Sequence, residues 1–143
     1  MGTFGVGPLH NDTGLDFKDN LAMMSSPAKR LKFIASALAG LASCDPVEDS
    51  DAEHTLQEGL GACAVVADKI RNTYYYLREP DDAEDLSLDM IPEIDERMRD
   101  LAIQSTRKAL GLARHPAMLA WPTVHDEQAY IDELGQLIRK LAR

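Results

Sequence analysis

The chain has 143 residues, of which 45% are hydrophobic and 27% are charged, and its formal net charge is −9. This length and composition fit one globular domain that buries a core without disulfides or metal, and they exclude a globally disordered chain. Residues 45–100 carry 5 basic and 17 acidic side chains, so the middle third holds the negative excess. That sign disfavours nucleic acid and an anionic membrane surface as partners, and the remaining candidates are basic proteins, cations or only water.

The sequence also bears on the compartment. The N-terminus lacks a basic region followed by an apolar stretch, so we expect no secretion signal, and no apolar run approaches the ~18 residues of a membrane helix. We therefore expect a cytoplasmic protein. The two cysteines, Cys44 and Cys63, fit this expectation as reduced thiols.

The first element in chain order is an arm, residues 1–12, which contains three glycines and the aromatic Phe4. Glycines allow a backbone to pass close over neighbouring helices, so we expect the arm to pack on the fold with Phe4 in a hydrophobic slot. Asn11 and Asp12 are typical of a turn and a helix cap. They predict a short helix that ends near Met24.

Two longer helices follow, over about 27–43 and 52–72, where apolar residues recur at helical spacing. Ser26 is the expected N-cap of the first, with Pro27 as its first residue. The second contains small residues in its middle, which allow a neighbouring helix to approach closely. One hypothesis is a homodimer through this small-residue face. The residues of that interface would be Gly59, Gly61 and Ala64.

The last part of the chain predicts an acidic loop, residues 78–89, and two more helices. Pro92 is expected in the first turn of a helix that ends near Leu112, and the final helix is expected to begin near His125 or Asp126. No segment alternates as a strand does. The sequence therefore predicts an all-α single domain over residues 1–143, a bundle of four main helices plus a short N-terminal helix, with the glycine-rich arm packed on it.

The arm reads Met-Gly-x-Phe-Gly-x-Gly-x-x-x-Asn-Asp, and an Asp-Phe pair follows in the first helix. The chain resembles a family of small, mostly bacterial proteins that is known only as a domain of unknown function and opens with Met-Gly-x-Trp-Gly-x-Gly-x-x-x-Asn-Asp. A turn that ends in Trp121, before a closing amphipathic helix, is similar as well. The chain departs at Phe4, where tryptophan is usual, at His10, where an acid is common, and at Gly14, where alanine is common. The resemblance implies an all-helical fold and brings no activity.

A compact polar cluster lies beside the arm motif and consists of His10, Asp12 and Asp16. A histidine oriented by a carboxylate can act as a general base, although no serine or cysteine has a defined place beside it. One hypothesis is thus an enzyme or small-ligand-binding protein with a pocket under the arm and these residues at its rim. No His-x-x-x-His or Cys-x-x-Cys spacing occurs, so we expect neither a metal nor another cofactor.

Three adjacent tyrosines precede the acidic loop. On a helix they point in three directions, so we expect at least one to be exposed. Aromatic anchors beside carboxylates are typical of a protein-binding patch, and the same pattern also fits an ordinary helix end. Our first hypothesis is a non-enzymatic interaction module, in concrete form an immunity or antitoxin-like protein that occludes a toxin domain. The predicted partner-binding residues are Tyr74, Tyr75, Tyr76, Glu79, Asp81, Asp82, Glu84 and Asp85.

Overall fold

The computed structural model describes residues 7–9, 11–81, 85–115 and 124–142, and in the last segment it describes side chains from residue 127 onward. Within these ranges all regular secondary structure is helical. This confirms the all-α fold that the periodicity predicts. The elements are α1 (Asp12–Met23), α2 (Pro27–Ala42), α3 (Ala52–Arg71), the 3₁₀ turn η1 (Leu88–Met90), α4 (Glu96–Leu112) and α5 (Val124–Ala142).

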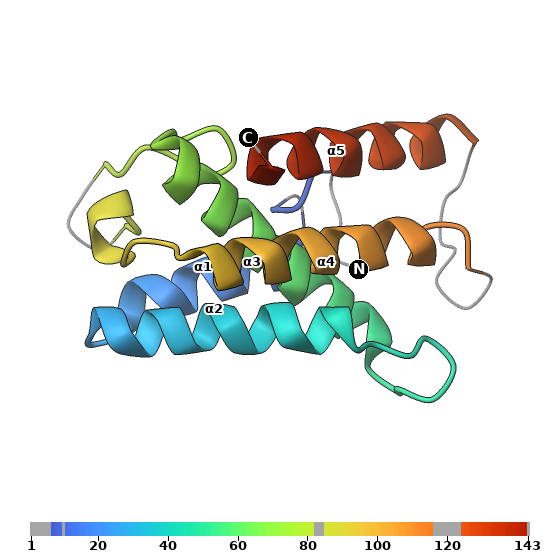
Figure 1. Ribbon diagram of the computed structural model, residues 1–143, viewed down its shortest axis with the longest axis horizontal. Helices are drawn as coiled ribbons and strands as arrows, with labels where there is room; N and C mark the ends of the chain where they lie inside the picture. The colour runs from blue at the N-terminus through green and yellow to red at the C-terminus, as the bar shows by residue number, and fades with distance from the viewer. Residues whose placement is uncertain (1–6, 10, 82–84, 116–123, 143) are drawn as a thin grey trace.

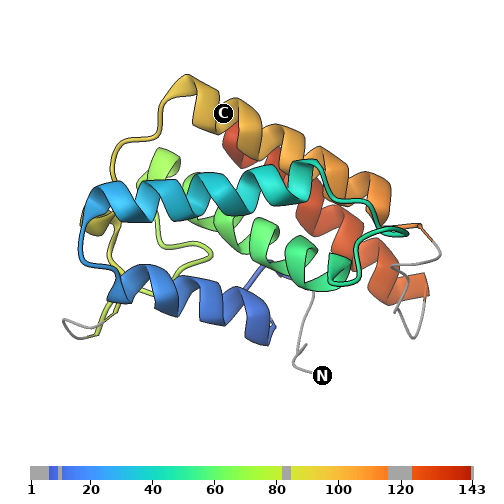
Figure 2. The same ribbon diagram turned by 90° about the horizontal axis from the view of Figure 1, so that it is seen from below.

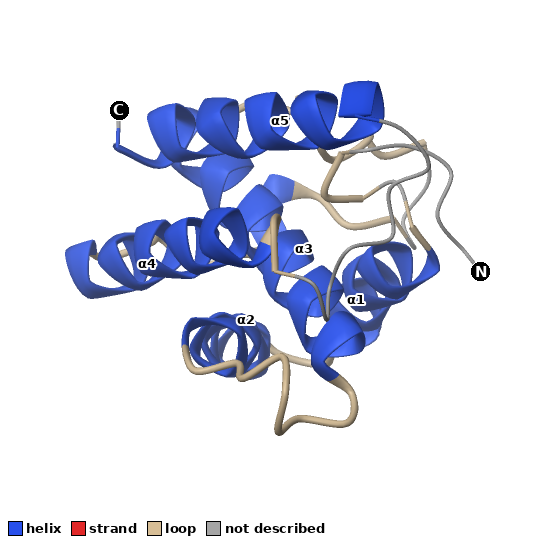
Figure 3. Cartoon of the chain, turned by 90° about the vertical axis from the view of Figure 1, so that its right-hand side faces the viewer, coloured by secondary structure: helices blue, strands red, loops and turns tan. Residues whose placement is uncertain are grey.

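The helices are arranged around α3. In Figure 1, α5, α4 and α2 lie side by side, and α3 crosses them obliquely. Figure 2 shows α1 running beside α3 and α2, and the end view of Figure 3 places α3 in the middle of the bundle. Helix α3 contacts each of the other four α-helices. It is therefore the central element of the fold.

The middle of α3 is buried on every side. Each residue from Gly59 to Asp68 is buried, although the sequence predicts a single apolar face for this helix. The difference arises because helices from both ends of the chain pack around it, which periodicity within one helix does not reveal. The small side chains in the middle of α3 allow the four other helices to pack closely against it.

Two of the glycines in α3 are contact points with other helices. A Cβ added to Gly59 would overlap with Leu41 of α2, whose Cδ2 would lie 2.7 Å away. A Cβ added to Gly61 would lie 3.5 Å from the Cα of Gly14 in α1. Both glycines and Ala64 are buried inside the single chain, so they are not accessible to a second copy. The hypothesis of a dimer interface on this face is therefore wrong.

The caps explain where the helices begin. Asn11 caps α1 by accepting a hydrogen bond from the Gly14 N–H at 2.6 Å, and Ser26 caps α2 ahead of Pro27 as predicted. The prediction that Pro92 lies in the first turn of α4 is wrong. The N-cap is Asp95, three residues after Pro92, and its side chain accepts a hydrogen bond from the Met98 N–H at 2.8 Å. Helix α4 therefore begins at Glu96.

The arm is described only in part. Pro8 and Leu9 are buried, and the side-chain amide of Asn11 donates to the Pro8 carbonyl at 3.4 Å. This local bond ties the arm turn, residues 7–9, to the start of α1. Phe4, for which the sequence predicts a hydrophobic slot, lies outside the described residues.

Candidate functional site

The tyrosine run lies in a turn that one carboxylate organises. Helix α3 ends at Arg71, before the tyrosines, and Asp68 in its last turn is 1% exposed. The two carboxylate oxygens accept hydrogen bonds of 2.8 to 3.1 Å from the Thr73 hydroxyl and from the backbone N–H groups of Tyr75, Tyr76 and Leu77. Because three successive N–H groups point at one side chain, the turn has a defined shape.

The three tyrosine side chains of this turn differ in exposure and in their contacts. Tyr74 is half-buried, and its hydroxyl accepts a hydrogen bond from the Leu88 N–H at 3.0 Å. Tyr75 is 54% exposed, which confirms that at least one ring of the run faces solvent. The Tyr76 ring meets that of Tyr75 edge to face, with centroids 4.8 Å apart. Of the three, only Tyr75 has the exposure of a surface anchor.

Helix α5 holds this turn in place. The Arg71 guanidinium donates to the carbonyls of Arg139 and Lys140 at 3.0 to 3.2 Å. The Lys140 Nζ lies 3.0 Å from the centroid of the Tyr75 ring, in a cation–π contact. The Tyr75 hydroxyl lies 3.5 Å from the Gln136 side-chain oxygen. The exposed Tyr75 ring is thus held against α5 by two side chains of that helix.

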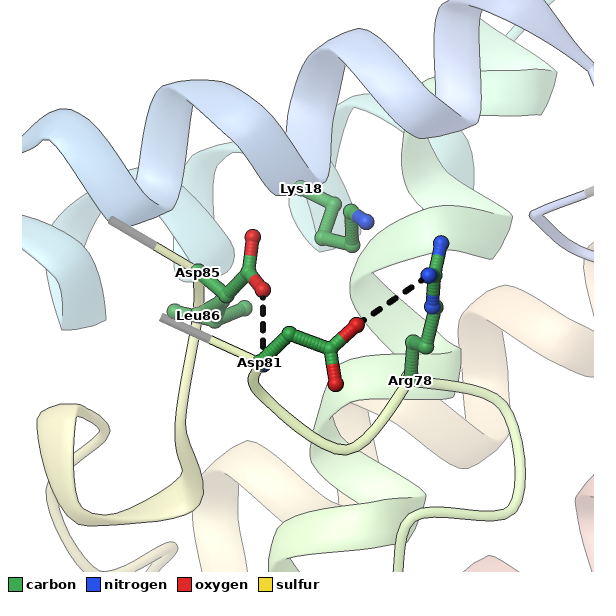
Figure 4. A pocket seen from close by; sticks show the side chains of 5 residues that line it. All are labelled: Lys18, Arg78, Asp81, Asp85 and Leu86. Carbon is green, nitrogen blue, oxygen red and sulfur yellow. Dashed lines mark hydrogen bonds and ion pairs between the residues drawn. The ribbon is translucent and has the colours of Figure 1, made fainter. Parts of the chain in front are cut away.

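The acidic loop begins just after this turn, and part of its charge is used within the chain. A cleft with a volume of about 220 Å³ is lined by Lys18, Arg78, Asp81, Asp85 and Leu86, whose side chains are drawn in Figure 4. The Arg78 guanidinium pairs with the Asp81 carboxylate at 3.2 Å, and the Asp85 carboxylate accepts from the Asp81 N–H at 2.9 Å. Two basic side chains thus share the cleft with two acids.

Three of the five acids that the sequence predicts to bind a partner lie within the described residues. Glu79, Asp81 and Asp85 are exposed, as binding to a partner requires. Asp82 and Glu84 lie outside the described residues.

A second cavity lies under the arm turn. It measures about 200 Å³ and is lined by Gly7, Pro8, Leu9, Tyr75, Tyr76 and Glu133. The Tyr76 hydroxyl is buried and is the one buried side-chain polar atom, within the described ranges, that has no hydrogen-bond partner. Burial, and next the nearby Glu133 carboxylate, raise the pKa of Tyr76.

The cavity differs from the pocket that the sequence suggests. Asp12 and Asp16 are exposed on α1 and are not among its lining residues, and His10 lies outside the described residues. Glu133 takes the place of the expected acids, and nothing in the sequence near it marks it for this position. Asp68 is the other residue missed, and there a signal exists: a lone acid follows the apolar stretch Ala62–Ala67.

The remaining chemistry-bearing groups are buried or scattered. Both cysteines are free and buried, and burial raises the pKa of the Cys63 thiol to about 12, which makes it a poor nucleophile at neutral pH. Within the described ranges, His, Cys, Asp and Glu side chains do not come together in threes as a metal site requires. In the same part of the chain, no helix is both long and apolar enough to cross a membrane.

A family model described as a domain of unknown function (DUF4259) matches residues 2–135. The match includes the arm, the tyrosine run, the acidic loop and Glu133. Neither the curated proteins nor the solved structures contain a significant match to the chain.

Proposed function

Because the chain belongs to the DUF4259 family, a domain of unknown function, we propose a function from its own surface: it is a non-enzymatic interaction module that binds a basic protein. Four exposed side chains, which we call the docking residues, would form the contact. These are Tyr75, Glu79, Asp81 and Asp85.

The observation that carries this proposal is the ordered exposure of Tyr75. The residue is 54% exposed, yet the turn that carries it is fixed by the buried Asp68 carboxylate and by contacts with α5. An aromatic ring that is ordered in advance loses little conformational entropy on binding, and aromatic residues dominate binding hot spots. The exposed carboxylates of Glu79, Asp81 and Asp85, which follow Tyr75 closely in the chain, would attract a basic partner to this part of the surface.

The concrete form that we favour is an immunity or antitoxin-like inhibitor that occludes a toxin domain in the cytoplasm. A small acidic helical domain suits that role, and in the residues that the structure describes the reactive groups are buried or scattered. The charge of residues 45–100, 17 acids against 5 bases, would speed association with a basic domain.

A pull-down from host lysate tests the proposal, with the purified protein as bait at low and at about 0.3 M salt. We expect a stoichiometric basic protein that is released at the higher salt. The test variant is the double reversal Glu79→Lys and Asp81→Lys, which should lose this protein. The control is the reversal Glu48→Lys and Glu53→Lys, which makes the same change in net charge at two other exposed acids.

The two reversals separate a docking site from general charge attraction. If only the test variant loses the protein, the docking residues form the contact. If both variants lose it equally, or neither does, the docking residues have no special role and this choice of surface is wrong.

The second candidate function is a small-ligand-binding protein or an enzyme. The cavity of about 200 Å³ under the arm turn favours it, because it combines two aromatic rings with a carboxylate. A small ligand that binds there with no protein captured from the lysate would favour this alternative.

A further inference from the structure

The cavity under the arm turn has the lining of a site for an organic cation. The Tyr75 and Tyr76 rings meet at 78°, with centroids 4.8 Å apart, and form an aromatic corner. Glu133 of α5 adds a carboxylate to the same cavity. Ring faces and a carboxylate both attract positive charge, and together they are the usual lining of an ammonium site.

The aromatic corner already holds one ammonium group from within the chain. The Lys140 Nζ lies 3.0 Å from the Tyr75 centroid and 5.2 Å from the Tyr76 centroid. Lys140 comes seven residues after Glu133 on α5, which is about 10 Å along the helix at 1.5 Å per residue. Glu133 is still within electrostatic reach of this ammonium: burial lowers the pKa of Lys140, and the Asp68 and Glu133 carboxylates act in the opposite direction. The carboxylate would therefore offset part of the repulsion between Lys140 and a second ammonium bound beside it.

Two polar groups at the cavity lack the partners that such a ligand would supply. The Tyr76 hydroxyl is buried without a hydrogen-bond partner, and among the described side chains no basic group lies within the 4.0 Å of an ion pair from Glu133. An ammonium has three N–H donors, so a group bound to the carboxylate would have donors left for the hydroxyl oxygen if the bound ammonium reaches it. The cavity, about 200 Å³, is also far larger than the ~30 Å³ of one water molecule.

We propose that this cavity binds the ammonium group of a lysine side chain from the basic partner. The proposal rests on the proposed function, because the lysine comes from the protein that the docking residues attract. Tyr75 belongs to both sites: its ring lines the cavity and is also exposed. The lysine would thus enter where the cavity meets the docking residues, at Tyr75, with Glu79 and Asp81 nearby in the chain.

The first test uses a small probe, Nα-acetyl-lysine N-methylamide, titrated into the full chain and followed by two-dimensional NMR. We expect millimolar binding, with shifts at Tyr75, Tyr76 and Glu133. Glu133→Gln should weaken binding at least tenfold. Asp132→Asn is the matched control, because it makes the same change at the adjacent, exposed position of α5, and it should bind as the wild type does. The norleucine analogue, which lacks the ammonium, should not bind.

A second variant separates a binding role from a structural one. Tyr76→Phe removes only a hydroxyl that has no partner in the free protein, so the melting temperature should stay the same or rise. Binding of the lysine probe should nevertheless weaken severalfold. A fall in melting temperature would show that the hydroxyl already has a structural partner, and it would overturn its assignment as a ligand group.

The other possible results distinguish a failure of the cavity proposal from a failure of the proposed function. The cavity proposal fails if the probe does not bind, if the norleucine analogue binds equally well, or if Glu133→Gln binds as the wild type does. If the pull-down partner stays bound to Glu133→Gln but leaves the docking variant, the proposed function stands and the cavity proposal falls. If the probe binds through Glu133 but no basic protein is captured, the lysine does not come from a protein partner.

Discussion

At the scale of single residues, two buried charged side chains shape the loops of this protein. Asp68 accepts four hydrogen bonds and thereby fixes the turn that carries the tyrosines. Arg30 is also buried, and its guanidinium donates to the carbonyls of Leu21, Met24 and Met90. It joins the turn between α1 and α2 to the end of η1. Both residues satisfy backbone groups that would otherwise lack partners in the interior.

We expect Asp68→Asn to lower the free energy of unfolding by about 3 kcal/mol. The amide keeps one oxygen but replaces the other with an NH₂ donor, so at least one buried backbone N–H loses its acceptor. Urea unfolding at pH 7 measures the change. Asp89→Asn, at an exposed position, is the control and should change stability by less than about 0.5 kcal/mol. Equal effects of the two substitutions would contradict the structural role of Asp68.

At the scale of helices, the contact between α3 and α2 depends on the absence of a side chain at Gly59. We expect Gly59→Ala to destabilise the protein by about 1 to 3 kcal/mol, because the added Cβ would meet Leu41. Gly111→Ala in α4 is the matched control, since a Cβ there meets nothing within 4 Å. It should stabilise by up to about 1 kcal/mol through helix propensity. Thermal unfolding of both variants checks the opposite signs, and a common sign would contradict the tight contact.

The helices can be predicted from the sequence because the caps and apolar spacing that indicate them lie within each helix or next to it. Ser26 with Pro27 marks the start of α2 directly, and apolar spacing indicates each helix. The start of α4 was missed because two local signals compete there, and the Asp95 cap prevails over Pro92.

The candidate site was predictable only in part. The tyrosine run and the acidic loop stand out in composition, and Tyr75 is exposed as one of the three must be. Glu133 belongs to the cavity through the packing of α5 against the arm turn and the tyrosine turn, which are distant in sequence. The all-round burial of α3 likewise depends on four partner helices. Neither property is encoded in the residues next to it.

At the scale of the whole molecule, the folded state holds the protons of one buried thiol and two tyrosine hydroxyls more tightly than the unfolded chain does. Burial raises the pKa of the Cys63 thiol from 9.0 to about 12, and it raises the pKa values of Tyr76 and Tyr130 as well. When the pH rises above 9, the unfolded chain releases the thiol proton while the folded chain retains it. The free energy of unfolding must therefore fall with rising pH, by up to about 1.4 kcal/mol per pH unit for each such group.

We expect Cys63→Ala to flatten this alkaline loss of stability. The variant lacks the thiol, so between pH 9 and 10, where the tyrosines of the unfolded chain are still largely protonated, its free energy of unfolding should fall less steeply than that of the wild type. Urea unfolding at intervals from pH 8 to 11 gives both slopes. Identical slopes would show that the folded state does not hold the Cys63 proton.

The central position of α3 affects how the chain folds while it is being synthesised. Helices α1 and α2 precede it in sequence and both pack on it, so during synthesis they leave the ribosome before their common support exists. Helices α4 and α5 emerge later and cover its remaining sides. Newly made protein would therefore pass through a stage with an exposed apolar surface, which ends only when the final helix, α5, has docked.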